Sequence, residues 1–358
     1  MADATDSKSV GGNPMRVRLS PRASVLVGLL WAFNALLAVA QQPSFRGTVV
    51  SAETGEPVGF SIVTLYPTLG KQFTDGMGAF AFAHTKSGKY ILSVRQIGYA
   101  PLDTQIVVTG DSTTIVRVAL RHLAIELPPV TIAGQQCTKP GRPDSSDAPL
   151  AAVFDQLQEN AHRFELFADS YPFRFRLERT LRDVTLHGDT LKTVDVLSLG
   201  NNDERPYEIG RVVAPGWGPW NSDLLVHTTV LQEFANNRFI ENHCFHLVGR
   251  DTIGGETLVR VDFEPAQRLA WADIAGAAYL DSITFELRFT ETSLTHPERS
   301  PLTEVNTVLA RTRFHTIAPG IPLQDSLIAI TTYRFGRFTK RIETQRLLDV
   351  RFRRRPPS

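Results

Sequence analysis

Cysteine is scarce in this chain of 358 residues, which contains only two, Cys137 and Cys244. Two cysteines are too few for a disulfide-rich scaffold. Neither lies in a Cys-x-x-Cys motif, so a structural zinc site is not expected. The pair could form one disulfide in an oxidising compartment or remain as two free thiols, and the sequence leaves both open.

The chain also lacks an excess of charge, because 38 Lys and Arg residues balance 37 Asp and Glu residues. This balance argues against a nucleic-acid partner. The basic stretch Arg351–Arg355 precedes two prolines and is expected to be a solvated tail. Hydrophobic residues make up 42% of the sequence, an ordinary globular composition, and the length allows about two domains.

Beyond residue 40 the chain has no apolar run near the ~18 residues that a membrane-spanning helix needs. No transmembrane helix is therefore expected in the mature chain. The one long apolar run, Ala23–Val39, follows Arg16, Arg18 and Arg22. It is short for a span and is broken by Asn34, which disfavours an uncleaved anchor.

The same run ends in Ala38-Val39-Ala40, a small-residue cleavage site. A basic region, an apolar run and such a site are the three parts of a secretory signal peptide. We therefore expect a signal peptide over residues 1–40 with cleavage after Ala40, and a periplasmic or outer-membrane-associated protein. Met15 is an alternative start to Met1.

Residues 45–120 have the pattern of short strands separated by turns. Apolar and polar residues alternate in Ile62–Tyr66 and Tyr90–Val94, and Phe80 and Phe82 share one face. Asp75-Gly76 is a hairpin-type turn signal. About seven short strands with turns every 8–12 residues predict a β-sandwich. Leu127–Ile132 would be an exit strand.

The second half begins with a linker and a helix. Gln135–Ala148 is rich in Gly, Pro, Ser and Asp and indicates a domain boundary. Leu150–Leu166 has a helical period, with Glu159 and Arg163 expected as an exposed i,i+4 pair. Strand-like alternation follows from Tyr171 onward, with a tight turn at Gly254-Gly255. The predicted strand-rich segments are Phe173–Leu177, Leu191–Leu199, Leu258–Phe263, Tyr279–Phe289, Leu302–Phe314, Ser326–Phe335 and Phe338–Val350.

The front half resembles a known family of domains. The matching pieces, in order, are Gly47-Thr48-Val49, Gly55-Glu56-Pro57-Val58, Phe60–Val63, Thr74–Phe80, Tyr90–Val94 and Gly98-Tyr99. They resemble the carboxypeptidase regulatory-like family of seven-stranded, transthyretin-like sandwiches in bacterial envelope proteins. Met77 and Ala79 depart mildly from that pattern. The resemblance implies an accessory binding or docking role beside other envelope domains, including outer-membrane receptors, and brings no catalytic residues.

The back half resembles another group of envelope proteins. Gly255–Pro265, followed by Gly276–Ser282, is similar to domains with a curved, half-barrel sheet, among them outer-membrane lipoprotein carriers. That likeness implies an apolar concavity that holds an acyl chain. It predicts a curved antiparallel sheet in this half of the chain.

The name of the front family invites a search for a zinc peptidase site. His162 and Glu165 have the His-x-x-Glu spacing, and His296 lies downstream as a third ligand. We reject this site, because the motif falls on the expected helix and the alternating α/β pattern of the peptidase is absent. His243-Cys244-Phe245-His246 lacks a third ligand and is interpreted as a strand with exposed histidines.

Other patterns have ordinary structural interpretations. Glu178, Asp183, Asp189 and Asp195 are scattered acids without a paired-carboxylate spacing. The aromatic loop Pro215–Trp220 is interpreted as an ordinary packed loop; the alternative is a loop at the edge of a binding site. Neither a Gly-x-Ser-x-Gly elbow nor a phosphate-binding glycine loop occurs in the sequence.

The sequence therefore predicts a mainly β protein with four segments. These are a signal peptide (1–40), a regulatory-like sandwich (44–133), a linker (134–149), and a helix plus curved antiparallel sheet (150–352). We expect a non-enzymatic envelope protein with no catalytic, cofactor-binding or metal-binding residues. Its partner would be an envelope protein, including outer-membrane receptor components, or an apolar, lipid-like ligand. A hydrolase or degenerate peptidase with a hidden site is the alternative.

Overall fold

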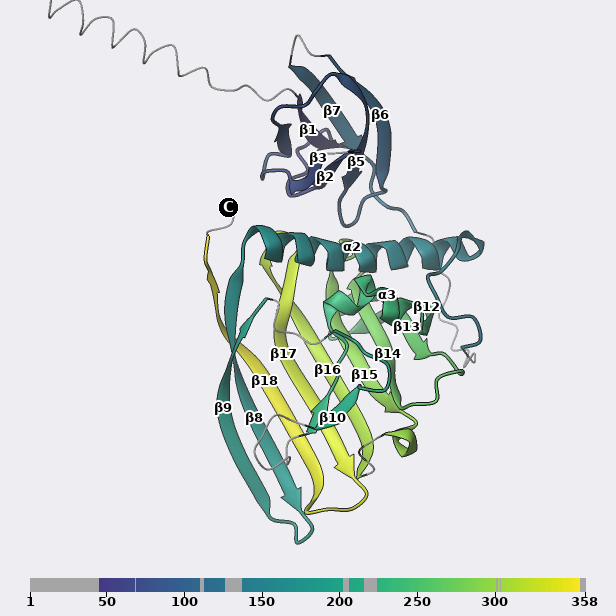
Figure 1. The fold of residues 1–358 in the computed structure, drawn as a ribbon, viewed down its shortest axis with the longest axis vertical. Helices are drawn as coiled ribbons and strands as arrows, with labels where there is room; N and C mark the ends of the chain where they lie inside the picture. Colours follow the sequence, from purple (N-terminus) through teal and green to yellow (C-terminus); the bar gives the residue numbers. More distant parts are fainter. Residues whose placement is uncertain are drawn as a thin grey trace, which may run out of the picture. The chain divides into compact units, whose positions relative to one another are not determined.

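A computed structural model describes residues 45–67, 69–109, 113–125, 137–201, 206–215, 224–300, 302 and 304–354 (Figure 1). The signal peptide, the exit strand at Leu127–Ile132 and most of the loop Pro215–Trp220 lie outside these residues, so those predictions are not tested. In the part that the structure describes, strands predominate and one long helix is present. The mainly β fold class is confirmed.

The front half is a sandwich of a three-stranded sheet, β4-β1-β7, and a four-stranded sheet, β3-β2-β5-β6. Its core contains Phe45, Leu65, Phe80 and Leu92, because alternate residues of each strand point between the sheets. The seven strands are β1 Phe45–Ser51, β2 Ile62–Tyr66, β3 Leu69–Phe73, β4 Ala79–Phe82, β5 Gly88–Arg95, β6 Leu102–Val108 and β7 Thr114–Leu120.

The turn at Asp75-Gly76 does not form the hairpin that its sequence suggested. β3 pairs with β2 and β4 pairs with β1, so the turn carries the chain from one sheet to the other. Asp75 Oδ1 accepts hydrogen bonds from the backbone N–H groups of Met77 and Ala79. Gly78 has φ +72°, and a Cβ there would lie 2.3 Å from the carbonyl oxygen of Val49. The Asp-Gly pair therefore indicates a tight turn, but it does not indicate whether the two flanking strands pair with one another.

The back half is built on one nine-stranded antiparallel sheet of order β12-β13-β14-β15-β16-β17-β18-β8-β9. The tight turn Gly254-Gly255 joins β12 to β13, as predicted, and a turn that begins at Asp281 joins β14 to β15. The strands are β8 Phe173–Thr185, β9 Thr190–Gly200, β12 His243–Ile253, β13 Glu256–Pro265, β14 Asp273–Asp281, β15 Leu287–Thr295, β16 Val305–Ala318, β17 Ile321–Tyr333 and β18 Phe338–Phe352.

Short elements complete this half of the chain. Strands β10 (Val213–Pro215) and β11 (Leu224–Val226) form a separate two-stranded sheet. The 3-10 helices are η1 (Ser145–Asp147), η2 (Leu231–Ala235) and η3 (Pro297–Arg299), and α3 (Asn237–Ile240) is a single helical turn.

Helix α2 (Ala148–Ser170) runs across one end of the large sheet (Figure 1). Asp147 caps its start by accepting a hydrogen bond from Leu150 N at 3.1 Å. The predicted apolar stripe is buried against the inner face of the sheet, where Phe154 packs on Phe245 with ring centroids 4.5 Å apart. The side chains of η2 and α3 join the same core.

The opposite side of α2 is not exposed, contrary to the sequence interpretation. Arg163 is completely buried, and its Nη1 donates to Gln96 Oε1 of the sandwich at 2.7 Å. Gln156 Oε1 accepts a hydrogen bond from Gly98 N at 2.8 Å. Gly98 belongs to the segment that carries the front-family resemblance, so part of that signature contacts the chain's own helix.

A disulfide joins Cys137 to Cys244 across 107 residues of sequence. The question that the sequence left open is thereby answered in favour of pairing. The bond ties the segment before α2 to β12, at one edge of the large sheet. Gly141 N reinforces this junction by donating to His243 O at 3.0 Å.

Arg163 should contribute far more to stability than an exposed arginine nearby. Removing it by Arg163→Ala leaves Glu159, whose Oε1 is buried, without the positive charge that most strongly lowers its pKa. We expect a loss of about 3–5 kcal/mol in the free energy of unfolding, measured by urea denaturation. The matched control is Arg142→Ala, since Arg142 forms an ion pair with Asp155 at the surface. This variant should lose under about 1 kcal/mol in the free energy of unfolding. Equal losses in the two variants would contradict the burial.

The disulfide should also contribute measurably to stability. Replacing both Cys137 and Cys244 by serine frees a loop of 107 residues in the unfolded chain, and we expect a loss of about 2–5 kcal/mol in urea denaturation. Reductant should lower the stability of the wild type to the same level and leave the double variant unchanged. A wild type that is insensitive to reductant would argue against the bond.

Candidate functional site

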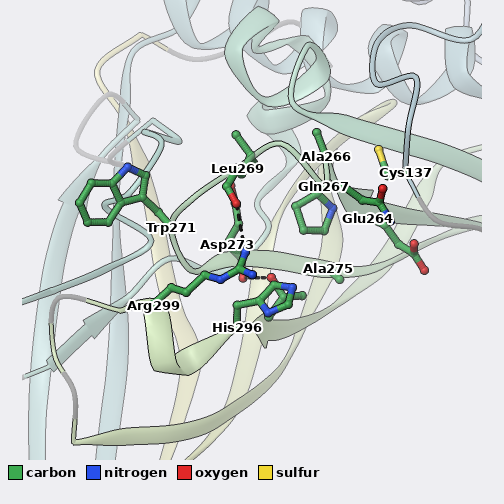
Figure 2. Close-up of a pocket in the computed structure, with 12 residues that line it drawn as sticks. Cys137, Glu264, Ala266, Gln267, Leu269, Trp271, Asp273, Ala275, His296 and Arg299 are labelled. Carbon is green, nitrogen blue, oxygen red and sulfur yellow. Dashed lines mark hydrogen bonds between the residues drawn. The ribbon is translucent and has the colours of Figure 1, made fainter.

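A cleft of about 260 Å³ lies beside the disulfide, at the start of β14 (Figure 2). Its size suits a ligand of one ring or two residues, because pockets for drug-sized ligands are ~300–1,000 Å³. Backbone bonds brace the wall, since Gln267 N donates to Cys137 O at 3.1 Å. The lining residues are Cys137, Glu264, Pro265, Ala266, Gln267, Leu269, Trp271, Asp273, Ala275, Thr295, His296 and Arg299.

Trp271 is the exposed aromatic group of this cleft. Its side chain lies at one end of the cleft and the residue is 53% exposed (Figure 2). Gly210, with φ +73°, lies against the indole, and a Cβ at that position would come within 3.2 Å of Trp271 Cγ. The glycine therefore allows the backbone to support the ring closely, while much of the indole surface stays open to solvent.

His296 and Arg299 form another part of the lining. His296 has the left-handed backbone conformation (φ +48°, ψ +53°), which is uncommon for a residue with a side chain. It precedes Pro297, the first residue of η3. Arg299 Nη1 donates to the carbonyl oxygen of Leu269 at 3.1 Å and so closes the turn that carries Trp271. Strained backbone of this kind tends to occur at functional sites.

Asp273 is the buried carboxylate of the cleft. Its Oδ2 accepts a hydrogen bond from the Tyr207 hydroxyl at 2.6 Å, and its Oδ1 accepts one from Ile274 N at 2.8 Å. The side chain is 1% exposed, and burial raises its pKa against the opposing effects of His243 and these hydrogen bonds. Both oxygens are thus already bonded within the protein.

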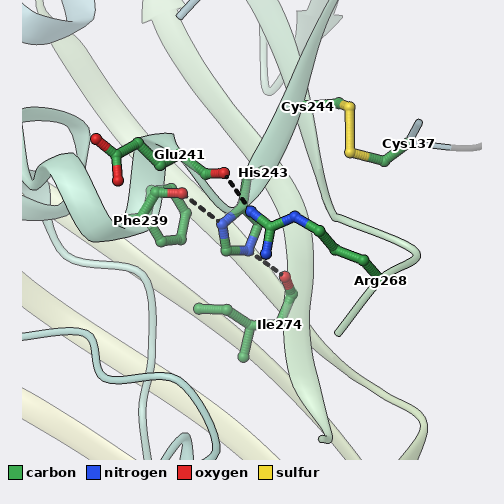
Figure 3. The surroundings of a disulfide bond; sticks show 7 residues. All are labelled: Cys137, Phe239, Glu241, His243, Cys244, Arg268 and Ile274. Carbon is green, nitrogen blue, oxygen red and sulfur yellow. Dashed lines mark hydrogen bonds between the residues drawn. A yellow bond between two sulfur atoms is a disulfide. The ribbon is translucent and has the colours of Figure 1, made fainter. Parts of the chain in front are cut away.

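His243 lies behind Asp273, with Nε2 3.8 Å from Asp273 Oδ1. Figure 3 shows its ring between two backbone carbonyls, with Nδ1 2.8 Å from Phe239 O and Nε2 3.0 Å from Ile274 O. Burial lowers the pKa of this imidazole. The ring connects α3 to β14 and is fully buried, so the expectation of an exposed histidine at this position is wrong.

A second buried acid continues this polar group. Glu233 Oε1 accepts a hydrogen bond from Tyr207 N at 3.2 Å and lies 2.9 Å from His227 Nε2. Tyr207 therefore contacts both carboxylates, one through its backbone and one through its hydroxyl. Burial is the main cause of the strongly raised pKa of that hydroxyl, which stays protonated and keeps donating to Asp273.

The residues weighed as a zinc site do not form one in the described part of the chain. His162 and Glu165 lie on α2, whereas His296 precedes η3 and lines the cleft. In the described ranges, no three His, Cys, Asp or Glu side chains are grouped so that they could hold a metal ion. The rejection of a metal site remains a prediction.

Three of the four scattered acids of the sequence form ion pairs between neighbouring strands. Asp183 accepts two hydrogen bonds from Arg341, and Asp195 accepts two from Arg179. Glu178 lies 3.6 Å from Arg346 Nη2. Each pair joins residues opposite one another in the register of β9, β8 and β18. They stabilise the sheet and do not converge on the cleft.

Sequence reasoning missed most of the cleft. Of its polar lining, only His296 and Cys137 had been considered, and for other roles. Trp271 and Asp273 stand two residues apart at the start of β14, but nothing in that spacing shows which is exposed. The contact between Tyr207 and Asp273 spans 66 residues and depends on the fold.

Comparison with known proteins identifies the front half. Residues 45–132 match the family model of the CarboxypepD_reg-like domain, which confirms the resemblance seen in the sequence. A search of curated proteins found no match. No helix among the described residues combines the length and apolar character needed to traverse a bilayer.

Solved structures include two with a likeness to the chain. A domain described as an outer membrane lipoprotein-sorting protein, from Vibrio parahaemolyticus, shares 9% identity with a TM-score of 0.32; the match covers 56% of this chain and 93% of that one. A DUF1329 family protein from Desulfovibrio piger shares 13% identity with a TM-score of 0.31, and the match covers 57% and 93%. The descriptions agree with the resemblance drawn from the back half.

Asp273 should make stability depend on pH. Because its pKa is raised in the folded protein, the folded state keeps a proton that the unfolded state has released. This contribution is present below the ordinary pKa of aspartate and is lost as the pH rises through the raised value. We expect Asp273→Asn to flatten the fall in the free energy of unfolding between acidic and neutral pH, measured by urea denaturation. The exposed Asp189→Asn should keep the wild-type slope; the same slope in both variants would contradict the assignment.

Proposed function

We propose that the protein is an exported, non-enzymatic cell-envelope protein that binds a small ligand in the cleft beside the disulfide. The observation that carries the proposal is the open indole of Trp271, supported by Gly210 in a concave site with polar lining. Concave sites that combine apolar surface with a few placed polar groups are the usual sites of small-molecule binding.

The lining favours a neutral polar ring, of which a sugar is the commonest biological example. An indole surface packs against the C–H face of such a ring. Glu264, Gln267 and Arg299 line the same cleft and offer planar hydrogen-bonding groups for hydroxyls. The acidic Glu264 and the basic Arg299 balance one another, so the lining does not select a strongly charged ligand.

The state of Asp273 favours binding over hydrolysis. A general acid or base must lie within hydrogen-bond reach of the proton that it transfers, and the side chain of Asp273 is only 1% exposed. Both oxygens of Asp273 already accept hydrogen bonds, from the Tyr207 hydroxyl and from Ile274 N. The carboxylate therefore serves to fix the wall of the cleft. A hydrolase remains the rival function, because a buried acid with a raised pKa can mark an active site.

An acyl chain inside the large sheet is less well supported. The inner face of the sheet is covered by buried side chains of α2, η2 and α3, with Phe239 packed on Phe263 at 5.5 Å between centroids. The inner face is thus occupied by the protein's own side chains. A cleft with an open indole is a better place for a ligand.

Two features support the proposed export. Residues 16–40 have the three parts of a signal peptide. The disulfide between Cys137 and Cys244 is of a kind that persists in oxidising compartments such as the bacterial periplasm. The regulatory-like sandwich adds an envelope-type module, whose Gln96 and Gly98 contact α2.

A glycan array followed by calorimetry tests the proposal. We expect a neutral oligosaccharide to bind, and Trp271→Ala to weaken its Kd by about tenfold or more through loss of stacking. The matched control is Phe335→Ala, since Phe335 is an aromatic residue of similar exposure outside the cleft. Absence of any glycan ligand, or equal losses in both variants, would contradict the proposal. Release of sugar products from a bound glycan would favour the hydrolase.

A further inference from the structure

The outer face of the large sheet, which points away from the core, carries an unexpected apolar surface. Antiparallel sheets with one buried face usually have a polar opposite face. Here Val194, Val196, Leu309 and Ile328 are each between 53% and 57% exposed. They alternate along their strands with buried or inward-facing residues, so they all lie on the outer face.

Strand register places these side chains in adjoining rows. In the first row Leu309 pairs with Ile330, and Ile330 pairs with Ile342. In the next row Ile328 pairs with Thr344. Thr344 in turn pairs with Thr180, and Thr180 pairs with Val194. We call the set Val194, Val196, Leu309, Ile328, Ile330 and Ile342 the outer apolar patch.

Cations flank the outer apolar patch on two sides. The first row continues from Ile342 to Arg182 and then to Lys192. A third row, two residues further along each strand than the Ile328 row, begins at Arg313, which pairs with Ser326. Within the described residues, Arg182, Lys192 and Arg313 form no ion pair. The acids of this face are already engaged, Glu291 with Arg311 and Glu178 with Arg346. The patch therefore has a net positive rim.

We propose that the outer apolar patch docks on an anionic lipid surface. Aliphatic side chains enter the headgroup region while neighbouring Arg and Lys side chains contact lipid phosphates. A second copy of the chain fits poorly, because a two-fold contact would place the rim cations against one another. The named patch residues are all aliphatic and include no aromatic or arginine anchor, which suits a lipid surface better than a protein partner.

Co-sedimentation with vesicles tests this docking. The full mature chain should bind vesicles of phosphatidylcholine and phosphatidylglycerol in equal parts, and should bind pure phosphatidylcholine much less. Arg182→Glu combined with Lys192→Glu should lower the partition coefficient about tenfold or more, since each cation near an anionic surface contributes ~1 kcal/mol. Leu309→Ser combined with Ile328→Ser should lower it as well.

Matched controls separate docking from general loss of charge or apolar surface. Lys89→Glu in the sandwich and Ile283→Ser in the exposed turn after β14 should keep wild-type binding. Circular dichroism verifies that each variant is folded. Equal binding to both vesicle types, absence of binding, or dimers that the patch variants abolish would each overturn the proposal. Glycan binding in the cleft is measured separately on the same variants and should not change.

Discussion

The structure depends on covering one face of a nine-stranded sheet. Such a sheet is wide, and its inner face carries large apolar side chains such as Phe173, Phe245 and Phe263. Only one long helix is available among the described residues, so α2 provides much of the cover and η2 and α3 complete it. Tyr207 and Phe239 belong to the same core, and Gly210, three residues after Tyr207, lies against Trp271. The cleft is thus a consequence of how the sheet is covered.

Helix α2 has a second role because its other side is also covered. Arg163 donates a hydrogen bond to Gln96, and Gln156 accepts one from Gly98 N. A single helix therefore contacts both halves of the chain. Burying a charged residue is costly unless partners surround it. The contact therefore specifies one arrangement of groups around Arg163, in which Gln96 and the carbonyl of Gly320 accept its hydrogen bonds.

Local patterns in the sequence predicted local structure well. Alternation located most strands, the period of Val153, Phe154 and Leu157 located α2, and the family signature identified the sandwich. Contacts between distant segments were not predictable. Arg163 has the spacing of an exposed helix pair, and its contacts with Gln96 and Gly320 reverse that interpretation. Likewise Trp271, Asp273 and Tyr207 form a site because of register and loop packing, which no short motif encodes.

The most direct test of the central claim is fluorine NMR of the protein labelled with fluorotryptophan, titrated with a glycan that the array identifies. The Trp271→Phe variant assigns the resonance of the cleft indole. We predict that this resonance shifts with saturation on adding the glycan while the other tryptophan resonances stay in place. A Trp271 resonance that does not respond, or a shift confined to another tryptophan, would contradict the cleft as the binding site.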